Sequence, residues 1–131
     1  MPVLGKDLVS QYYLEVINGH DFDAITKFFS NERLIEGIRR GCMVLFKSFP
    51  DLHSSIEEMV AEGDRIVCHA LSTGTHDGEW MGIPATGRHI TFEYAEGYRI
   101  GDGVFVGYWC VPDMAGLMRQ LTAESPAGTV A

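Results

Sequence analysis

Hydrophobic residues recur at helical spacing in the first part of the chain and at strand spacing in the second. In residues 7–17 the apolar positions follow the i, i+3, i+4, i+7 pattern of an amphipathic helix. Asp21 can cap a second helical segment over residues 22–29, and Asn31 can cap a third over residues 34–46. The pattern therefore predicts three helices at the start of the chain.

Two β-hairpins are predicted in the second part of the chain. Residues 53–64 lead into residues 65–76 through an acidic turn that contains glycine. Residues 89–100 lead into residues 104–111 through a Gly-Asp-Gly turn, and Asp-Gly is among the strongest short signals for a hairpin. Four antiparallel strands are therefore expected.

The remaining segments complete the expected architecture. A loop marked by Gly and Pro, residues 77–88, joins the two hairpins, and residues 114–121 have the spacing of a short helix. Residues 122–131 are expected to form a flexible tail. With 131 residues, of which 46% are hydrophobic and 21% charged, the chain is expected to fold as one α+β domain over residues 1–131.

The alternation of side chains along the last two strands indicates which faces are buried. On the third strand one face carries Phe92, Tyr94, Glu96, Tyr98 and Ile100. On the fourth strand, Val104, Val106, Tyr108 and Cys110 alternate with Phe105, Gly107, Trp109 and Val111. Because both faces of the fourth strand are apolar, both need a cover. The helices can cover one face, and a second copy of the chain is the expected cover of the other, which predicts a homodimer through the sheet.

Charge and cysteine content exclude several classes of partner. The formal net charge is −8 and the isoelectric point is near 4.9, so we expect neither nucleic acid nor a membrane surface as a partner. The three cysteines are far apart and the histidines have no metal-ligand spacing, so neither a disulfide framework nor a metal site is predicted. The chain shows no apolar run of signal-peptide or membrane-spanning length, and we expect a cytoplasmic protein.

Four segments together resemble one protein family. They are SFPDLHSSIEEMVAEGDRIV at residues 48–67, MGIPATGR at 81–88, EGYRIGDGV at 96–104 and YWCVPDMAGLMRQL at 108–121. In combination they make roughly residues 5–121 similar to the SnoaL-like polyketide cyclases of the nuclear-transport-factor-2-like fold group. The resemblance implies a cone in which N-terminal helices pack on a curved antiparallel sheet and enclose a pocket.

The resemblance also implies an activity. Members of the family act without a cofactor, usually as homodimers, on hydrophobic polyketide-like or other natural-product intermediates. General acid/base chemistry then closes a ring by an aldol reaction, isomerises the substrate or opens an epoxide. This chain departs from the family in the short segment between its second and third helices. It also has Gly107-Tyr108 before Trp109, where many relatives have Glu or His.

Asp113 is the residue that the resemblance nominates as the acid/base. It stands where the family's W-x-x-x-D segment has its aspartate, after Trp109. A carboxylate at the end of an aromatic-lined strand is expected to be partly desolvated, which favours general acid/base work. Asp113 also stands where an N-cap of the last helix is expected, a role worth about 1 kcal/mol. Both roles are open, and one residue can fill both.

Three other residues are candidates for proton transfer or for stabilising charge on the substrate. Glu96 is an acid among aromatic residues if its face is concave, and an edge or interface charge if that face is convex. Tyr98 can stabilise a developing enolate, or it can be a core residue whose hydroxyl reaches water. His69 can act as a proton shuttle if its side chain points inward.

Substrate binding is expected from the large apolar and aromatic residues around the pocket: Tyr94, Trp109, Trp80, Met81, Phe92 and Tyr12. Trp80 and Met81 can form a lid over the mouth of the cone, and loop packing or a dimer contact is the alternative. Two classes of function stay open: an enzyme of the cyclase, isomerase or epoxide-opening kind, and a non-catalytic module for small-molecule binding or assembly, since one fold hosts unrelated functions.

Overall fold

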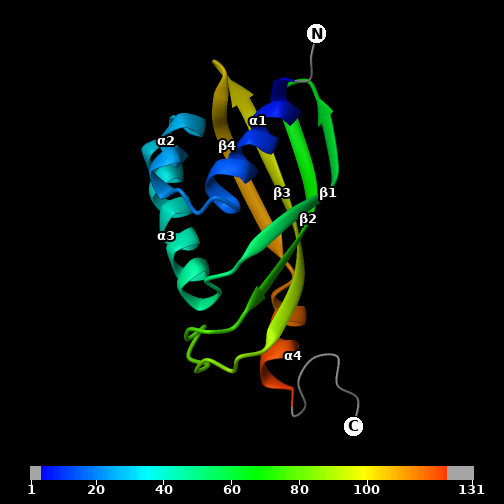
Figure 1. Ribbon diagram of the computed structural model, residues 1–131. Helices are drawn as coiled ribbons and strands as arrows, with labels where there is room; N and C mark the ends of the chain where they lie inside the picture. Colours follow the sequence, from blue (N-terminus) through cyan, green and yellow to red (C-terminus); the bar gives the residue numbers. More distant parts are fainter. Residues whose placement is uncertain (1–3, 124–131) are drawn as a thin grey trace.

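A curved antiparallel sheet forms one layer of the molecule, and helices cover its inner face (Figure 1). The computed structural model describes residues 4–123. The helical elements are α1 (Leu4–Tyr12), a π-helical turn (Tyr13–Ile17), a 3-10 turn (Phe22–Ala24), α2 (Ile25–Phe28), α3 (Glu32–Ser48) and α4 (Met114–Thr122). The strands are β1 (His53–Glu62), β2 (Arg65–Thr75), β3 (His89–Gly101) and β4 (Val104–Pro112). The predicted α+β architecture is confirmed; the expected flexible tail falls mostly on residues 124–131, which lie outside the described residues.

The two N-terminal caps predicted from the sequence form hydrogen bonds to the helix starts. The Asn31 side chain accepts hydrogen bonds from the backbone N–H groups of Arg33 and Leu34, at 2.8 and 3.2 Å. The Asp21 side chain accepts one from the backbone N–H of Ala24 at 3.3 Å. Each cap satisfies N–H groups that have no partner within the helix, which fixes where these segments begin.

The sheet has the strand order β1-β2-β3-β4, and each neighbouring pair is antiparallel. The β3–β4 hairpin turns at Asp102 and Gly103, which have backbone φ angles of 53° and 81°. A two-residue hairpin turn of this kind needs positive φ at both central positions, and Asp-Gly tolerates it. The predicted hairpin is therefore confirmed together with its physical cause.

A β-bulge in β4 changes the face on which side chains lie. Arg99 pairs with Gly107 and Ile100 with Phe105, so Val106 is an extra residue on β4. The extra residue shifts the alternation, and Phe105 and Tyr108 both face inward, where Phe105 is fully buried and Tyr108 lines a cavity. The expectation that they occupy opposite faces is wrong, because it assumed unbroken alternation.

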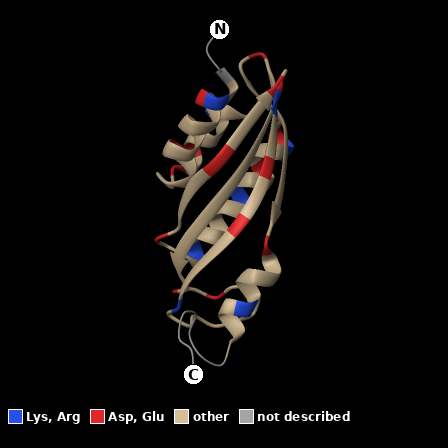
Figure 2. Ribbon diagram, turned by 90° about the vertical axis from the view of Figure 1, so that its right-hand side faces the viewer, with Lys and Arg blue, Asp and Glu red and all other residues tan. Residues whose placement is uncertain are grey.

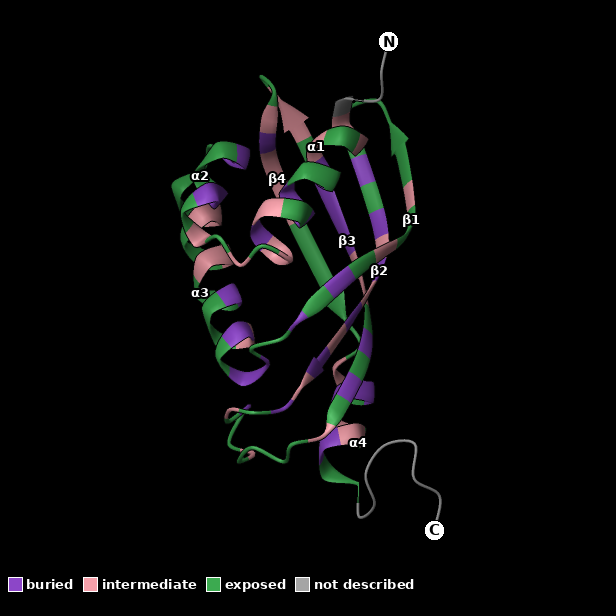
Figure 3. Ribbon diagram, viewed as in Figure 1, coloured by how far each residue is buried: buried purple, intermediate pink, exposed green. Residues whose placement is uncertain are grey.

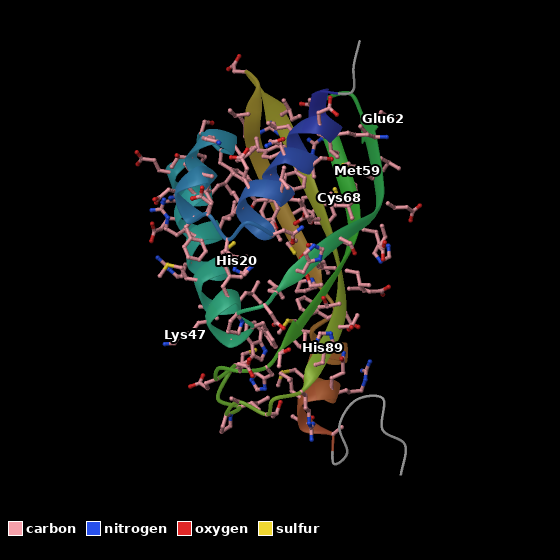
Figure 4. The ribbon with its side chains drawn as sticks, viewed as in Figure 1. His20, Lys47, Met59, Glu62, Cys68 and His89 are labelled. Atoms are coloured by element: carbon pink, nitrogen blue, oxygen red, sulfur yellow. The ribbon has the colours of Figure 1, made fainter. Side chains whose placement is uncertain are left out.

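Two hydrophobic clusters lie between the sheet and the helices, where Figure 3 shows the buried residues along the inner side of the strands. One cluster packs α1 and α2 against β2, β3 and β4 and includes Cys68. Figure 4 labels Cys68 on β2 and its neighbour Met59 on β1. The other packs Leu117 and Leu121 of α4 against Ile90 of β3. These clusters are separate, and a cavity lies between the layers that they join.

No helix within residues 4–123 covers the outer face of the sheet (Figure 1). Figure 2 looks toward this side, where acidic residues interrupt largely uncharged strands. Exposed apolar side chains on the outer side of the strands are Val60, Val67, Trp109 and Val111.

Among the helices in residues 4–123, none has both the length and the apolar composition that a membrane crossing requires.

Candidate functional site

A cavity of about 680 Å³ lies between the inner face of the sheet and the helices. Its lining residues come from α1, α3, α4, all four strands and the loop between the hairpins, and most of them are apolar. One end is held together by His20, which stacks on Phe46 of α3 with ring centroids 4.0 Å apart and contacts the Leu52 carbonyl oxygen at 3.0 Å (Figure 4). A cavity of this size and composition is typical of sites for small organic ligands.

Glu96 is the one acidic residue among those that line this cavity. It lies in the middle of β3 and its side chain is 3% exposed. Its Oε1 accepts hydrogen bonds from the hydroxyl groups of Tyr13 and Tyr98, the latter at 2.5 Å. Its Oε2 accepts one from the Tyr108 hydroxyl at 2.8 Å. Three tyrosines from two strands and the first helical region thus hold one carboxyl group in a fixed position.

The environment of Glu96 raises the pKa of its carboxyl group. Burial raises the pKa of the Glu96 carboxyl, and the hydrogen bonds from Tyr13, Tyr98 and Tyr108 offset part of that increase. None of the salt bridges found in residues 4–123 involves Glu96. A carboxyl group whose pKa is raised by burial in a cleft is a typical candidate for acid/base function.

The tyrosines around Glu96 remain hydrogen-bond donors at neutral pH. Burial raises the pKa of Tyr98 and Tyr108 well above the ordinary tyrosine value, and the nearby Glu96 raises both further. The Tyr13 hydroxyl also lies 2.8 Å from the Tyr94 hydroxyl, which extends the network along the cavity wall. A chain of hydroxyl groups therefore links Glu96 through Tyr13 to Tyr94, which lines the cavity.

A second polar group in the cavity comes from two serines on neighbouring strands. Ser54 of β1 and Ser72 of β2 both line the cavity, and their hydroxyl oxygens are 2.6 Å apart. Both residues are buried. The pair gives a ligand a further hydrogen-bonding position in an otherwise apolar wall.

Asp113 lies outside the cavity. Its side chain accepts a hydrogen bond from the Gly116 backbone N–H at 2.9 Å, which makes it the N-cap of α4. The residue is exposed and is not among those that line the cavity. The expectation of a desolvated Asp113 facing the pocket is wrong, because capping α4 turns the carboxylate toward the helix start. Its predicted role in capping is confirmed, and its role in catalysis stays a prediction.

Three other candidates lie away from the cavity. His69 lies on the outer face, where its Nε2 is 3.3 Å from Glu93 and both side chains are largely exposed. Trp109, 46% exposed, packs over Gly97 on the same outer face, so that a Cβ on Gly97 would overlap the indole ring. Met81 is 66% exposed and does not line the cavity. The expected place at the pocket is wrong for Trp109 and Met81, and His69 does not meet the condition of pointing inward. On β2 and β4 the other set of side chains faces the cavity, and Met81 lies in the 77–88 loop with its side chain exposed.

The remaining candidates lie where the sequence placed them. Four of the expected substrate-binding residues line the cavity: Tyr12, Trp80, Phe92 and Tyr94. Tyr98 is buried beside the cavity and reaches it through its hydrogen bond to Glu96. Trp80 closes the cavity on the side of the 77–88 loop, while its neighbour Met81 points away, so the two residues do not act together as a lid.

Sequence reasoning missed two members of the tyrosine network, Tyr13 and Tyr108. Tyr13 begins the π-helical turn, whose i to i+5 hydrogen bond runs from the Asn18 N–H to the Tyr13 carbonyl oxygen at 2.8 Å. A regular helical pattern does not signal such a turn, although π-helical turns are frequent at functional sites. Tyr108 faces inward because of the bulge at Val106, which is also not evident from the pattern.

No metal cluster is evident in the part of the chain that the structure describes. Within residues 4–123, no three His, Cys, Asp or Glu side chains lie close enough together to hold a metal ion. The three cysteines are free, and burial raises the pKa of the two that line the cavity, Cys42 and Cys110, to about 11. They therefore stay thiols at neutral pH, and the one carboxyl group among the residues that line the cavity is that of Glu96.

Helices packed on a curved antiparallel sheet, with a largely apolar cavity between them, define the nuclear-transport-factor-2-like class of α+β proteins. A family model for the SnoaL-like polyketide cyclases matches residues 7–121, and the chain belongs to this family. The resemblance found in the sequence is thereby confirmed.

Solved structures agree with this assignment. AclR from Streptomyces galilaeus, a candidate hydroxylase, is 28% identical, with 88% of this chain and 93% of AclR covered and a TM-score of 0.78. TsrD from Streptomyces laurentii is 27% identical, with coverage of 94% and 98% and a TM-score of 0.81. A candidate polyketide cyclase from Acidithiobacillus ferrooxidans, 24% identical with coverage of 95% and 99% and a TM-score of 0.81, shares the fold. A comparison with curated proteins gave no match.

Proposed function

We propose that this protein is a cofactor-independent cyclase or isomerase for a hydrophobic polyketide-like or other natural-product intermediate, with Glu96 as its general acid/base. One observation carries the proposal. In an apolar cavity large enough for a small organic ligand, a buried carboxyl group with a raised pKa is held by three tyrosine hydroxyls. Family membership supports the reaction class, and it leaves the substrate open.

The Glu96 carboxylate would remove a proton from a carbon next to a substrate carbonyl group. Its Oε2 accepts one hydrogen bond where Oε1 accepts two, so Oε2 has a lone pair left for that proton. The electron pair of the broken C–H bond moves onto the carbonyl oxygen and gives an enolate. Tyr94, which lines the cavity, would turn its hydroxyl proton from Tyr13 to that oxygen and donate a hydrogen bond to it.

Ring closure would follow within the same cavity. In an aldol reaction the enolate carbon attacks a second carbonyl carbon of the substrate, and the alkoxide that forms takes the proton back from Glu96. In an isomerisation the proton returns to a different carbon. Neither sequence of steps needs an oxidant or a metal, and the apolar walls shield the enolate from water.

The test measures proton abstraction directly. In D₂O, wild-type protein is expected to exchange the α-protons of 2-tetralone, an enolisable bicyclic ketone, faster than buffer does. Because a general acid/base contributes about 10²- to 10⁴-fold, Glu96→Gln should lower the protein-catalysed rate by at least about 100-fold. Asp113→Asn should leave it within about twofold, since Asn also caps helices. NMR follows the exchange, and a normal rate in the Glu96 variant would refute the proposal.

A non-catalytic module that binds small molecules is the second candidate. Asp113 lies outside the cavity. The Glu96 oxygens already accept hydrogen bonds from tyrosines, and a buried acid with a purely structural role is satisfied in the same way. On this account 2-tetralone binds, and no variant changes its exchange rate. A third candidate is epoxide opening, in which protonated Glu96 would donate its proton to the epoxide oxygen while a hydroxyl group of the substrate or a water attacks the epoxide carbon and the C–O bond breaks. The attacking oxygen would then give its own proton to the Glu96 carboxylate.

We further propose that the protein is a cytoplasmic homodimer joined through the outer face of the sheet. Val60, Val67, Trp109 and Val111 are exposed on the outer face of the strands, which no helix of residues 4–123 covers. A second sheet of the same kind would bury these side chains, and the free energy gained grows with the apolar area removed from water. Light scattering should give twice the chain mass for wild-type protein and a monomer mass for Trp109→Glu. A wild-type monomer at micromolar concentration would contradict this.

A further inference from the structure

The exposed side of α3 borders the mouth of the cavity. Arg33, Gly37, Arg40, Gly41 and Val44 line the cavity and are also exposed. Arg33, Gly37, Gly41 and Val44 are spaced three or four residues apart and Arg40 adjoins Gly41, which places the set along one side of the helix. Across the opening, exposed Cys110 and Pro112 at the end of β4 and half-buried Met114 at the start of α4 also line the cavity. The mouth therefore lies between α3 on one side and the β4–α4 junction on the other.

Two glycines keep the α3 side of this mouth open. A Cβ atom built on Gly37 or Gly41 meets no other heavy atom within 4 Å. Gly within a helix is less favourable than Ala by about 0.5–1 kcal/mol, so these positions give up helix stability although close packing does not require Gly. The result is an open stretch of helix surface between and beside the side chains of Arg33 and Arg40.

The charge at the mouth is opposite to that of the whole chain. The protein carries a formal net charge of −8, yet the charged residues that line the cavity are Arg33, Arg40 and, on the opposite wall, Glu96. Arg33 takes part in none of the salt bridges found in residues 4–123. Arg40 lies 3.4 Å from Glu36, but both side chains are more than 60% exposed, and such a surface pair is worth little. Both guanidinium groups are therefore available to a ligand.

We propose that Arg33 and Arg40 bind an oxyanion group, a carboxylate or a phosphate, on a substrate whose apolar rings fill the cavity. The identity of this ligand as the substrate rests on the proposed function; the binding preference does not. The planar guanidinium group can donate two parallel hydrogen bonds to either oxyanion. Positive charge at the mouth of an apolar cleft also attracts an anion that the rest of this acidic surface repels. The two arginines would thus fix which end of the substrate enters first.

Matched naphthalene probes test the preference by isothermal titration calorimetry. At low salt, wild-type protein should bind 2-naphthoate or 2-naphthyl phosphate about tenfold more tightly than uncharged 2-naphthamide. The double variant Arg33→Gln/Arg40→Gln should lose this preference while its affinity for 2-naphthamide stays the same. Whichever anion binds more tightly identifies the oxyanion as a carboxylate or a phosphate ester.

A control variant with the same change in net charge tests whether the anion preference comes from the two arginines or from the net charge of the protein. Arg39 and Lys47 also lie on α3 and do not line the cavity; Figure 4 labels Lys47. The variant Arg39→Gln/Lys47→Gln should keep the preference for the anion. Equal binding of 2-naphthoate, 2-naphthyl phosphate and 2-naphthamide by wild-type protein, or a preference that survives in the Arg33/Arg40 variant, would overturn the proposal.

The readout is also independent of turnover. If the anion preference is found while Glu96→Gln exchanges protons normally, the arginine site stands and the proposed function fails. If Glu96→Gln loses the exchange activity and all three probes bind equally, the proposed function stands and the arginine site fails.

Discussion

The surroundings of Glu96 and Asp113 differ although each residue is an acid at or near the last two strands. Glu96 lies mid-strand on the inner face, buried, with tyrosine hydroxyls on both oxygens. Asp113 follows the end of β4, exposed, with its carboxylate bonded to the first turn of α4. The comparison teaches that place relative to the cavity, and not a match to a family motif, decides which carboxyl group can meet a ligand.

The largest effect is expected from moving the Glu96 carboxyl group. Glu96→Asp shortens the side chain by one methylene and withdraws the acid from Tyr108 and from the cavity. A misplacement of about 1 Å can lower the rate by about 100-fold, so exchange of the 2-tetralone α-protons should fall by about 10- to 100-fold. Asp113→Glu serves as the matched control. If the two variants exchange protons equally fast, the contrast between the two residues is lost.

Removing the tyrosine that holds Oε2 should have a smaller effect. Tyr108→Phe leaves Oε2 without its protein partner, and an unsatisfied buried group costs about 1–3 kcal/mol. We expect the free energy of unfolding in urea to fall by about 1 kcal/mol and the exchange rate to fall about tenfold. Trp109→Phe, the neighbour on the outer face, should leave the exchange rate unchanged. If Trp109→Phe lowered the exchange rate, that result would contradict the assignment of Trp109 to the outer face, away from the site.

The pH dependence of stability should differ between the wild type and Glu96→Gln. Burial raises the pKa of Glu96 in the folded protein above its unfolded value, so below the unfolded value both states hold the proton. As pH rises, the unfolded chain loses its proton first, and the contribution of Glu96 to stability falls until the folded pKa is passed. Each pH unit by which the pKa is raised corresponds to about 1.4 kcal/mol.

The measurement compares urea denaturation of both proteins from pH 4 upward. Because the other carboxylates are common to both proteins, the difference in unfolding free energy isolates Glu96. Wild type should lose stability relative to Glu96→Gln as pH rises. A difference that is constant with pH would show that the Glu96 pKa is the same in both states.

The smallest effect is expected at Asp113. Asp113→Ala removes the α4 cap and should lower the free energy of unfolding by about 1 kcal/mol, while Asp113→Asn recovers most of it. Thermal denaturation checks the stability, and the 2-tetralone assay should give wild-type rates for both variants. A large rate loss in Asp113→Asn without loss of stability would restore the role that the family motif suggested.

Much of the fold could be predicted because the local signals agree with the tertiary structure. Asn31 caps α3, Asp102 and Gly103 form the turn between β3 and β4, and alternation places Glu96 and Tyr98 on the same face of β3. In each case one physical rule, such as helix capping or the sign of φ, acts over a few residues. Because these local rules already fix the local structure, tertiary packing has few alternatives to choose from.

The rest of the site depends on features that local patterns do not encode. The bulge at Val106 brings Tyr108 inward, and the π-helical turn begins at Tyr13. His69 faces outward because β2 buries Cys68 and Ala70 on its inner side, and apolar spacing on that strand allowed either choice. The sequence therefore predicts the type of chemistry at the site, a carboxyl group among tyrosines, better than it predicts which residues form the site.

The most direct test of the account is a titration of the Glu96 carboxyl group. In protein labelled with ¹³C at the glutamate side-chain carboxyl carbon, the resonance that disappears in Glu96→Gln reports this residue alone. The account predicts that this resonance titrates above the ordinary glutamate pKa of about 4.3, because burial outweighs the tyrosine hydrogen bonds. Titration at or below the ordinary value would contradict it, since Glu96 would then be a solvated or charge-paired acid.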